Sequence, residues 1–220
     1  METLTFAGSY EDDRGREDII WRIEGSRRYR ISSLEYFTSI RGVDVWGRDF
    51  DGLEPVAGSA AAGVLPLNAA DELTECVITC DLPCTTMVAD KRQPTTITFS
   101  LDLHLSSQKT GGVGALRLSL VLAGVTYAVT DDWFEDGVQR LEKSLPSGVR
   151  LTCCVTCLSS DYSPGGHGLT GISCHRGAKE QYLAVKSKRD YWKVPVAEEV
   201  PETYVCGEYE RRIPGTGYRG

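Results

Sequence analysis

ITFSLDLHL, at residues 97–105, is the stretch that decides the fold. Its apolar residues alternate with polar ones, and this period of two is typical of a strand with one buried face. The segment LRLSLVL at 116–122 repeats the alternation after a glycine-rich loop. Neighbouring segments of this kind pair as antiparallel hairpins, so we predict that both leucine faces lie on one core.

Shorter alternating segments occur earlier in the chain. Apolar side chains alternate at Ile19, Trp21 and Ile23 and again at Val43 and Val45, which predicts further antiparallel strands. A third segment of this type contains Tyr29 and Ile31. Residues 52–70 lack such a period and are rich in Gly, Pro and Ala, so we expect a surface connection and an internal boundary there.

Two later segments have helical spacing. Over 131–145 the apolar residues recur every three or four positions, which predicts an amphipathic helix that is capped by Asp132 and ends before Pro146. A second helix is expected from Gly177 to Asp190. The fold class is therefore α+β: residues 1–150 form an antiparallel β-rich region with one or two packing helices. Residues 151–220 form a Cys-rich, zinc-knuckle-like subdomain packed on that region.

Composition restricts the class of protein. The chain has 220 residues, 41% of them hydrophobic, and a formal net charge of −7. Nucleic acids and anionic membranes bind basic protein surfaces, and an acidic chain lacks such a surface overall. We therefore expect neither a nucleic acid nor a membrane as a partner. It contains no apolar run long enough to span a membrane and no signal peptide, which predicts a cytoplasmic protein. Its eight cysteines are then expected to be thiols or metal ligands.

Four cysteines in the last third suggest a structural zinc site. Cys154 and Cys157 form a Cys-x2-Cys turn, and Cys174 and Cys206 supply two more thiolates. Zinc prefers four tetrahedral sulfur or imidazole ligands, and His175 is an alternative to one of these thiolates. The competing interpretation is a set of buried free thiols.

The other four cysteines are predicted to be core thiols. Cys153 follows the apolar register of its strand, and Cys76, Cys80 and Cys84 lie on a β-branched segment that we expect to end in a turn at Pro83.

The loop SSDYSPGGHGLTG at 159–171 carries the candidate catalytic groups. Asp161 could orient His167 as a general base, and the tail residue Arg219 could reach the same loop. The alternative is a solvent loop whose polar groups satisfy its own turns. We also expect the tail to dock near this loop through Tyr218.

Three segments carry a resemblance to a known family: CVTCLSSDYSPGGHGLTG (154–171), YLAVKSKRDYW (182–192) and ETYVCGEYERRIPGTGYRG (202–220). Together they resemble an uncharacterised bacterial family, a domain of unknown function common in antibiotic-producing bacteria, most strongly over residues 150–220. The resemblance implies the pattern of Cys154, Cys157 and Cys206 and the terminal GTGYRG, and it carries no established activity.

The sequence thus leads to two main hypotheses; a third, nucleic-acid binding, is supported only by the basic residues of the helix expected over 177–190. The first is a zinc-stapled accessory or protein-interaction protein whose partner is an unknown protein or small molecule. The alternative is a small enzyme whose site lies beside the zinc and uses Asp161 and His167, with Tyr162 or Arg219 as further candidates.

Overall fold

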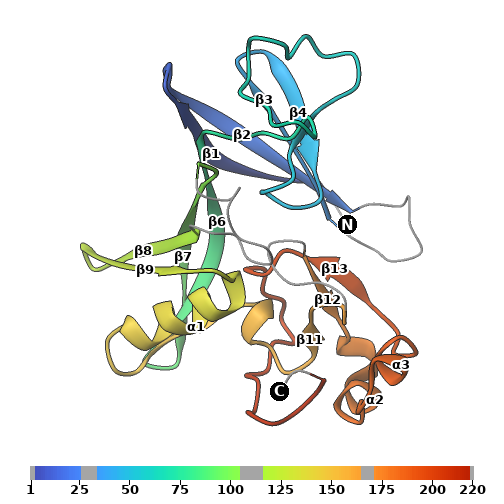
Figure 1. The fold of residues 1–220 in the computed structure, drawn as a ribbon. Coiled ribbons are helices and arrows are strands. Elements are labelled where there is room, and N and C mark those ends of the chain that lie inside the picture. The colour runs from blue at the N-terminus through green and yellow to red at the C-terminus, as the bar shows by residue number, and fades with distance from the viewer. Residues whose placement is uncertain (1–2, 26–33, 105–115, 165–170, 219–220) are drawn as a thin grey trace.

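A large antiparallel sheet forms the body of the molecule in the computed structural model, which describes residues 3–25, 34–104, 116–164 and 171–218. The strand order is β5-β4-β3-β2-β1-β6-β7-β8-β9, and β10 also pairs with β6 (Figure 1). The strands are β1 (Leu4–Asp12), β2 (Gly15–Gly25), β3 (Leu34–Ile40), β4 (Val43–Gly47), β5 (Glu54–Pro55), β6 (Val77–Val88), β7 (Lys91–Asp102), β8 (Leu116–Leu122), β9 (Val125–Asp131) and β10 (Val149–Thr152). Sheet and helices together confirm the coarse α+β prediction.

The predicted hairpin is present as β7 and β8. Phe99 lies opposite Leu118 and Leu101 opposite Leu116, and all four side chains are buried in the main core. Leu105, the last residue of the predicted strand, lies outside the described residues. The alternation of apolar residues therefore fixed both the pairing and the face of this part of the sheet.

One amphipathic helix, α1 (Phe134–Ser144), packs against β8 and β9 (Figure 1). The predicted cap at Asp132 is wrong, because the helix begins after Trp133 and no side chain caps it. The carboxylate of Asp131 instead accepts hydrogen bonds from the backbone N–H groups of Asp132 and Trp133.

Pro83 does not end its strand, as predicted, but lies within β6. On one side β6 pairs with β7 along its whole length. On the other side β1 pairs with Val77 to Cys80, and β10 pairs with Thr85 to Val88. Pro83 falls between these two partners. No strand pairs with β6 on that side at this position, so the missing backbone N–H of proline costs no hydrogen bond.

The segment 52–70 is not a boundary between two units. Leu53, Ala61 and Leu65 are buried in the main core, and Glu54–Pro55 adds a short strand to the sheet. The prediction failed because these apolar residues have no regular spacing, although they face the same core as the strands.

The C-terminal part consists of short elements beside the large sheet (Figure 1). They are the 3-10 turns η2 (Cys154–Thr156) and η3 (Arg176–Ala178), helices α2 (Lys179–Leu183) and α3 (Lys188–Tyr191), and a small sheet of β11 (Ser160–Asp161), β12 (Ile172–Cys174) and β13 (Glu198–Val200). The single helix predicted over 177–190 is thus divided in two. Ser187 is the reason, because its side chain accepts a hydrogen bond from Asp190 N and caps a new helix.

Candidate functional site

The four predicted zinc ligands come from three segments that meet at η2. Cys154 begins this turn and Cys157 follows it, and Cys157 N donates to Cys154 O at 2.9 Å. Cys174 ends β12, whose neighbour β11 directly follows the turn. This tight turn brings the backbones of the two cysteines of the Cys-x2-Cys pair close together, as in metal knuckles.

The tail brings the fourth cysteine to the same place. Cys154 N donates to Tyr204 O at 2.7 Å, and Leu158 N donates to Glu210 O at 2.7 Å. Cys157 also forms a β-bridge with Arg211. Residues 204–211 therefore run along the turn, and Cys206 lies within this paired segment.

The electrostatic surroundings of Cys154 include other thiols. Burial raises the pKa of Cys154, and the thiols of Cys157, Cys174, Cys153 and Cys206 raise it further. Burial also raises the pKa of Cys174, while the Arg176 guanidinium, which donates to Cys174 Sγ at 3.5 Å, opposes that shift. In the described ranges, however, no three His, Cys, Asp or Glu side chains are arranged as a group that could hold a metal ion.

His175, the alternative ligand, directs both ring nitrogens elsewhere. Its Nδ1 lies 3.0 Å from Pro195 O and its Nε2 lies 3.2 Å from the Tyr191 hydroxyl. The ring also stacks on Tyr182, with 5.0 Å between centroids. Because burial lowers the pKa of His175, the imidazole is a neutral member of this aromatic cluster.

Asp161 is enclosed by the same aromatic cluster. Its side chain is only 1% exposed, and Oδ2 accepts a hydrogen bond from the Tyr182 hydroxyl at 2.8 Å. The Tyr191 hydroxyl donates to Asp161 O at 3.3 Å. His167 and Arg219, its predicted partners, lie outside the described residues, so the expected Asp161–His167 hydrogen bond stays a prediction.

Tyr218 docks on this cluster, close to Asp161. Its ring lies 5.6 Å from the Tyr191 ring, and it packs against the cluster of Tyr182, Val185, Tyr191 and Val194. Gly217, at φ +76°, approaches Tyr182 so closely that an added Cβ would lie 2.5 Å from the hydroxyl oxygen. Gly217 is thus required for this close approach.

Two tail arginines fasten the C-terminal part to α1. Arg211 forms a two-point ion pair with Glu142 and donates to Leu151 O at 3.1 Å. Arg212 donates to Cys157 O at 3.2 Å and lies 3.6 Å from Glu135. The sequence analysis missed this role, since the charge pairs join residues about seventy positions apart.

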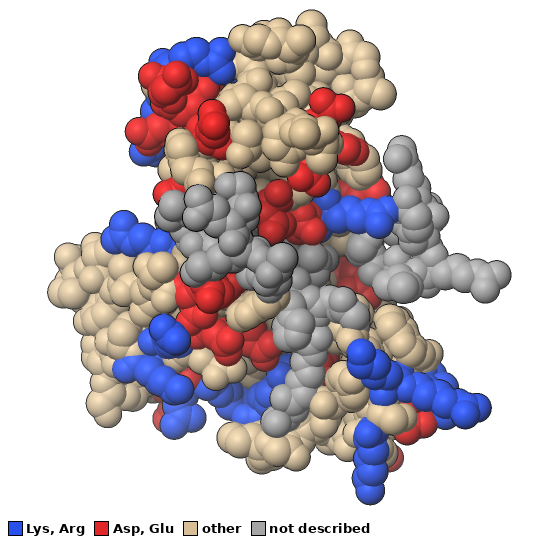
Figure 2. Space-filling model, in the orientation of Figure 1, with Lys and Arg blue, Asp and Glu red and all other residues tan. Residues whose placement is uncertain are grey.

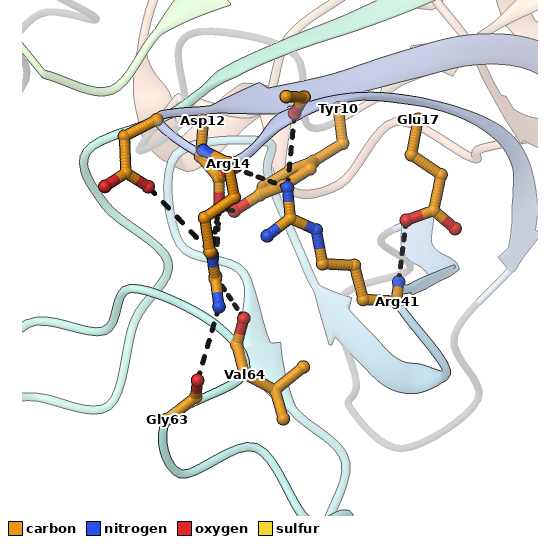
Figure 3. Close-up of polar contacts among 9 residues, drawn as sticks. Tyr10, Asp12, Arg14, Glu17, Arg41, Gly63 and Val64 are labelled. Atoms are coloured by element: carbon orange, nitrogen blue, oxygen red, sulfur yellow. Dashed lines mark hydrogen bonds and ion pairs between the residues drawn. The ribbon is translucent and has the colours of Figure 1, made fainter.

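A second polar cluster, also missed from the sequence, surrounds Asp12 at the end of β1 (Figure 3). Its carboxylate accepts hydrogen bonds from the Tyr10 hydroxyl, the Arg14 guanidinium and Arg41. Arg14 continues to the carbonyls of residues 63 and 64, so the cluster joins three segments.

The contacts of Asp12 determine its charge. Burial opposes ionisation, but the hydrogen bonds from Tyr10, Arg14 and Arg41 outweigh that effect and lower the pKa of Asp12 to about 2. The carboxylate is 1% exposed and both arginines are directed at it. Its role is therefore to hold the edge of the sheet together.

The surface of α2 and α3 is basic, although the chain as a whole is acidic (Figure 2). Lys186, Lys188 and Arg189 are exposed here. Trp192, 52% exposed, and Leu183 lie beside them in the sequence. Exposed apolar side chains within a charged rim are typical of protein-interaction surfaces.

The family follows from a match over most of the fold. The chain belongs to a family of unknown function, DUF6304, whose model matches residues 4–160. The resemblance in the sequence is strongest over 150–220, so the two ranges overlap only at the segment that contains Cys154 and Cys157. No curated protein and no solved structure matches the chain. Among the described residues, no helix has the length and apolar character to cross a membrane.

Proposed function

We propose that this protein is a cytoplasmic, zinc-stapled accessory or protein-interaction protein. Cys154, Cys157, Cys174 and Cys206 would hold one structural zinc ion between the η2 turn, β12 and the tail. The observation that carries this proposal is the backbone pairing that brings these segments together: Ser160 pairs with Cys174, and Cys157 forms a bridge with Arg211 of the tail.

The surroundings of the thiols fit thiolate ligands. Zinc binds deprotonated cysteine, and the Arg176 guanidinium beside Cys174 Sγ favours that form. Metal binding would supply the remaining free energy for deprotonation of the buried Cys154 thiol.

The interaction role is supported by the face of α2 and α3. Trp192 and Leu183 offer exposed apolar area, and Lys186, Lys188 and Arg189 add exposed positive charge to the same short segment. A protein segment that carries carboxylates and an apolar side chain would complement this face. The zinc would act indirectly, by holding the short helices in place.

The enzyme alternative has less support among the described residues. The Asp161 carboxylate already accepts a hydrogen bond from Tyr182 and is almost fully buried, so it is poorly placed to take a proton from a substrate. Its structural role within the aromatic cluster accounts for its conformation.

Elemental analysis with two matched variants tests the zinc site. We expect about one zinc per chain in protein purified without chelators, and the same content in Cys80→Ser, whose thiol is buried in the sheet core. Cys206→Ser should lose the metal, although Cys206 is only half-buried and its replacement leaves no core cavity. Wild-type protein without metal, or full zinc content in Cys206→Ser, would overturn the proposal.

A further inference from the structure

Cys84 and Cys153 face each other across two antiparallel strands. The pairing of β6 with β10 ends with Thr85 opposite Thr152. One step further along the same register would place Cys84 opposite Cys153, the residue that follows β10. The two thiols also interact electrostatically, as expected of neighbouring sulfur atoms. Opposed residues of antiparallel strands have Cα atoms about 4.5–5.5 Å apart, which lies within the range that a disulfide spans.

Both side chains point to the same buried face. Cys84 and Thr86 are buried on β6, and Leu151 and Cys153 are buried on the partner segment. Cys80, the next inward-facing cysteine of β6, is about 13 Å further along the strand, at about 3.3 Å per residue, and cannot substitute for Cys84. The arrangement therefore defines one specific pair of thiols.

Only one member of the pair can be reached from outside. Cys84, 5% exposed, lines a groove of about 250 Å³ where β6 lacks a strand partner, and Cys153 is 0% exposed. The groove wall is mostly apolar, with Leu4, Phe6 and Val205 among its residues. A small neutral molecule can enter a groove of this size and polarity, and it would meet Cys84 first.

We propose that Cys84 and Cys153 form a redox-active dithiol that reacts with small neutral disulfides through this groove. The Cys84 sulfur attacks one sulfur of the small disulfide, the S–S bond breaks, and one small thiol leaves with the proton of Cys84. The Cys153 sulfur then attacks Cys84 Sγ and releases the second small thiol with the proton of Cys153. The protein loses two electrons and two protons, and the small disulfide is reduced to two thiols.

This dithiol is separate from the proposed zinc ligands, because neither cysteine belongs to that set. Its closure would covalently join β6 to the residue that precedes the η2 turn. The redox state of the pair would thereby limit the movement of the C-terminal part relative to the sheet.

Oxidation of the folded protein with 2-hydroxyethyl disulfide tests the proposal. After alkylation and digestion with trypsin, we expect the peptide of residues 49–91 to be linked to that of residues 151–176, and the number of free thiols in denaturant to fall by two from eight. The link should persist in Cys80→Ser and disappear in Cys84→Ser. Cys153→Ser should stop at a hydroxyethylthio adduct on Cys84.

The results that would overturn the proposal are equally specific. A link that persists in Cys84→Ser would assign the oxidation to another pair. A wild-type protein that accumulates the Cys84 adduct without forming the link would show that Cys153 cannot reach it. If Cys153→Ser does not fold, the comparison of Cys84→Ser with Cys80→Ser still decides.

Discussion

Replacing Asp12 with Asn tests the cluster at the edge of the sheet. The substitution preserves the shape of the side chain and removes the charge that faces Arg14 and Arg41. It also turns one acceptor oxygen into an N–H donor that points at guanidinium donors. We therefore expect the junction of the β1–β2 turn, the β3–β4 turn and the loop near residue 64 to weaken (Figure 3).

The pKa of Asp12 sets the expected magnitude. Lowering from an ordinary value of 3.8 to about 2 corresponds to about 2 kcal/mol of folding free energy, at about 1.4 kcal/mol for each tenfold change. The Asp12 side chain is 1% exposed but that of Arg14 is 43% exposed, so solvent screens part of this contribution. Asp12→Asn should therefore reduce the free energy of unfolding at pH 7 by up to about 2 kcal/mol.

The pH dependence gives the effect a signature. A carboxyl with a lowered pKa in the folded state stabilises the protein fully above its ordinary pKa, and this contribution is lost as the pH falls toward the folded value. The difference between wild type and Asp12→Asn should thus be constant above about pH 5 and shrink toward zero as the pH approaches 2.

Urea unfolding at several pH values, followed by circular dichroism, measures both quantities. Asp13→Asn is the control, since the neighbouring Asp13 side chain is 93% exposed and makes only a distant contact with Arg14. Equal losses in the two variants would refute the argument, as would a loss in Asp12→Asn that does not vary with pH.

Two further predictions concern the core and the tail. Leu101→Ala should cost about 2–5 kcal/mol in a denaturant melt and Ser100→Ala much less, because only Leu101 is fully buried on the inner face; similar losses would mean the register is wrong. Gly217→Ala should lower the melting temperature more than Gly215→Ala. Both glycines have positive φ, but only the first leaves no room for a Cβ, beside Tyr182. Equal shifts would contradict the docking of the tail.

The sequence predicted the large sheet well, because that information is local. Alternation identifies a strand and its buried face from five to seven residues, as at 97–105 and 116–122. The same logic identified α1 and kept Cys80 and Cys84 in the core. Prediction failed where the buried residues have no regular spacing in the sequence, as around Leu53. It also failed where a single polar residue divides a helix, as at Ser187.

The candidate site could be predicted only in part. The Cys-x2-Cys spacing identifies Cys154 and Cys157 as a pair, but nothing local indicates that Cys206 lies beside them. That placement depends on backbone pairing between the tail and the turn, which joins residues about fifty positions apart. Ion pairs such as Arg211–Glu142 are equally non-local, and they give no signal in the sequence of either segment.

The size of the C-terminal elements explains why a staple would be needed here. Strands of two or three residues and helices of four or five are too short to be stable alone, since a short helix does not recover the free energy of its nucleation. Among the described residues, their separate core cluster has Tyr182, Val185, Tyr191 and Val194 as its buried members. The remaining stability must come from contacts with the sheet, such as those of the tail arginines, and from links that close the long loops. A zinc ion held by three separate segments would supply such links where the apolar core is smallest, and the large sheet, with its continuous core, has no need of them.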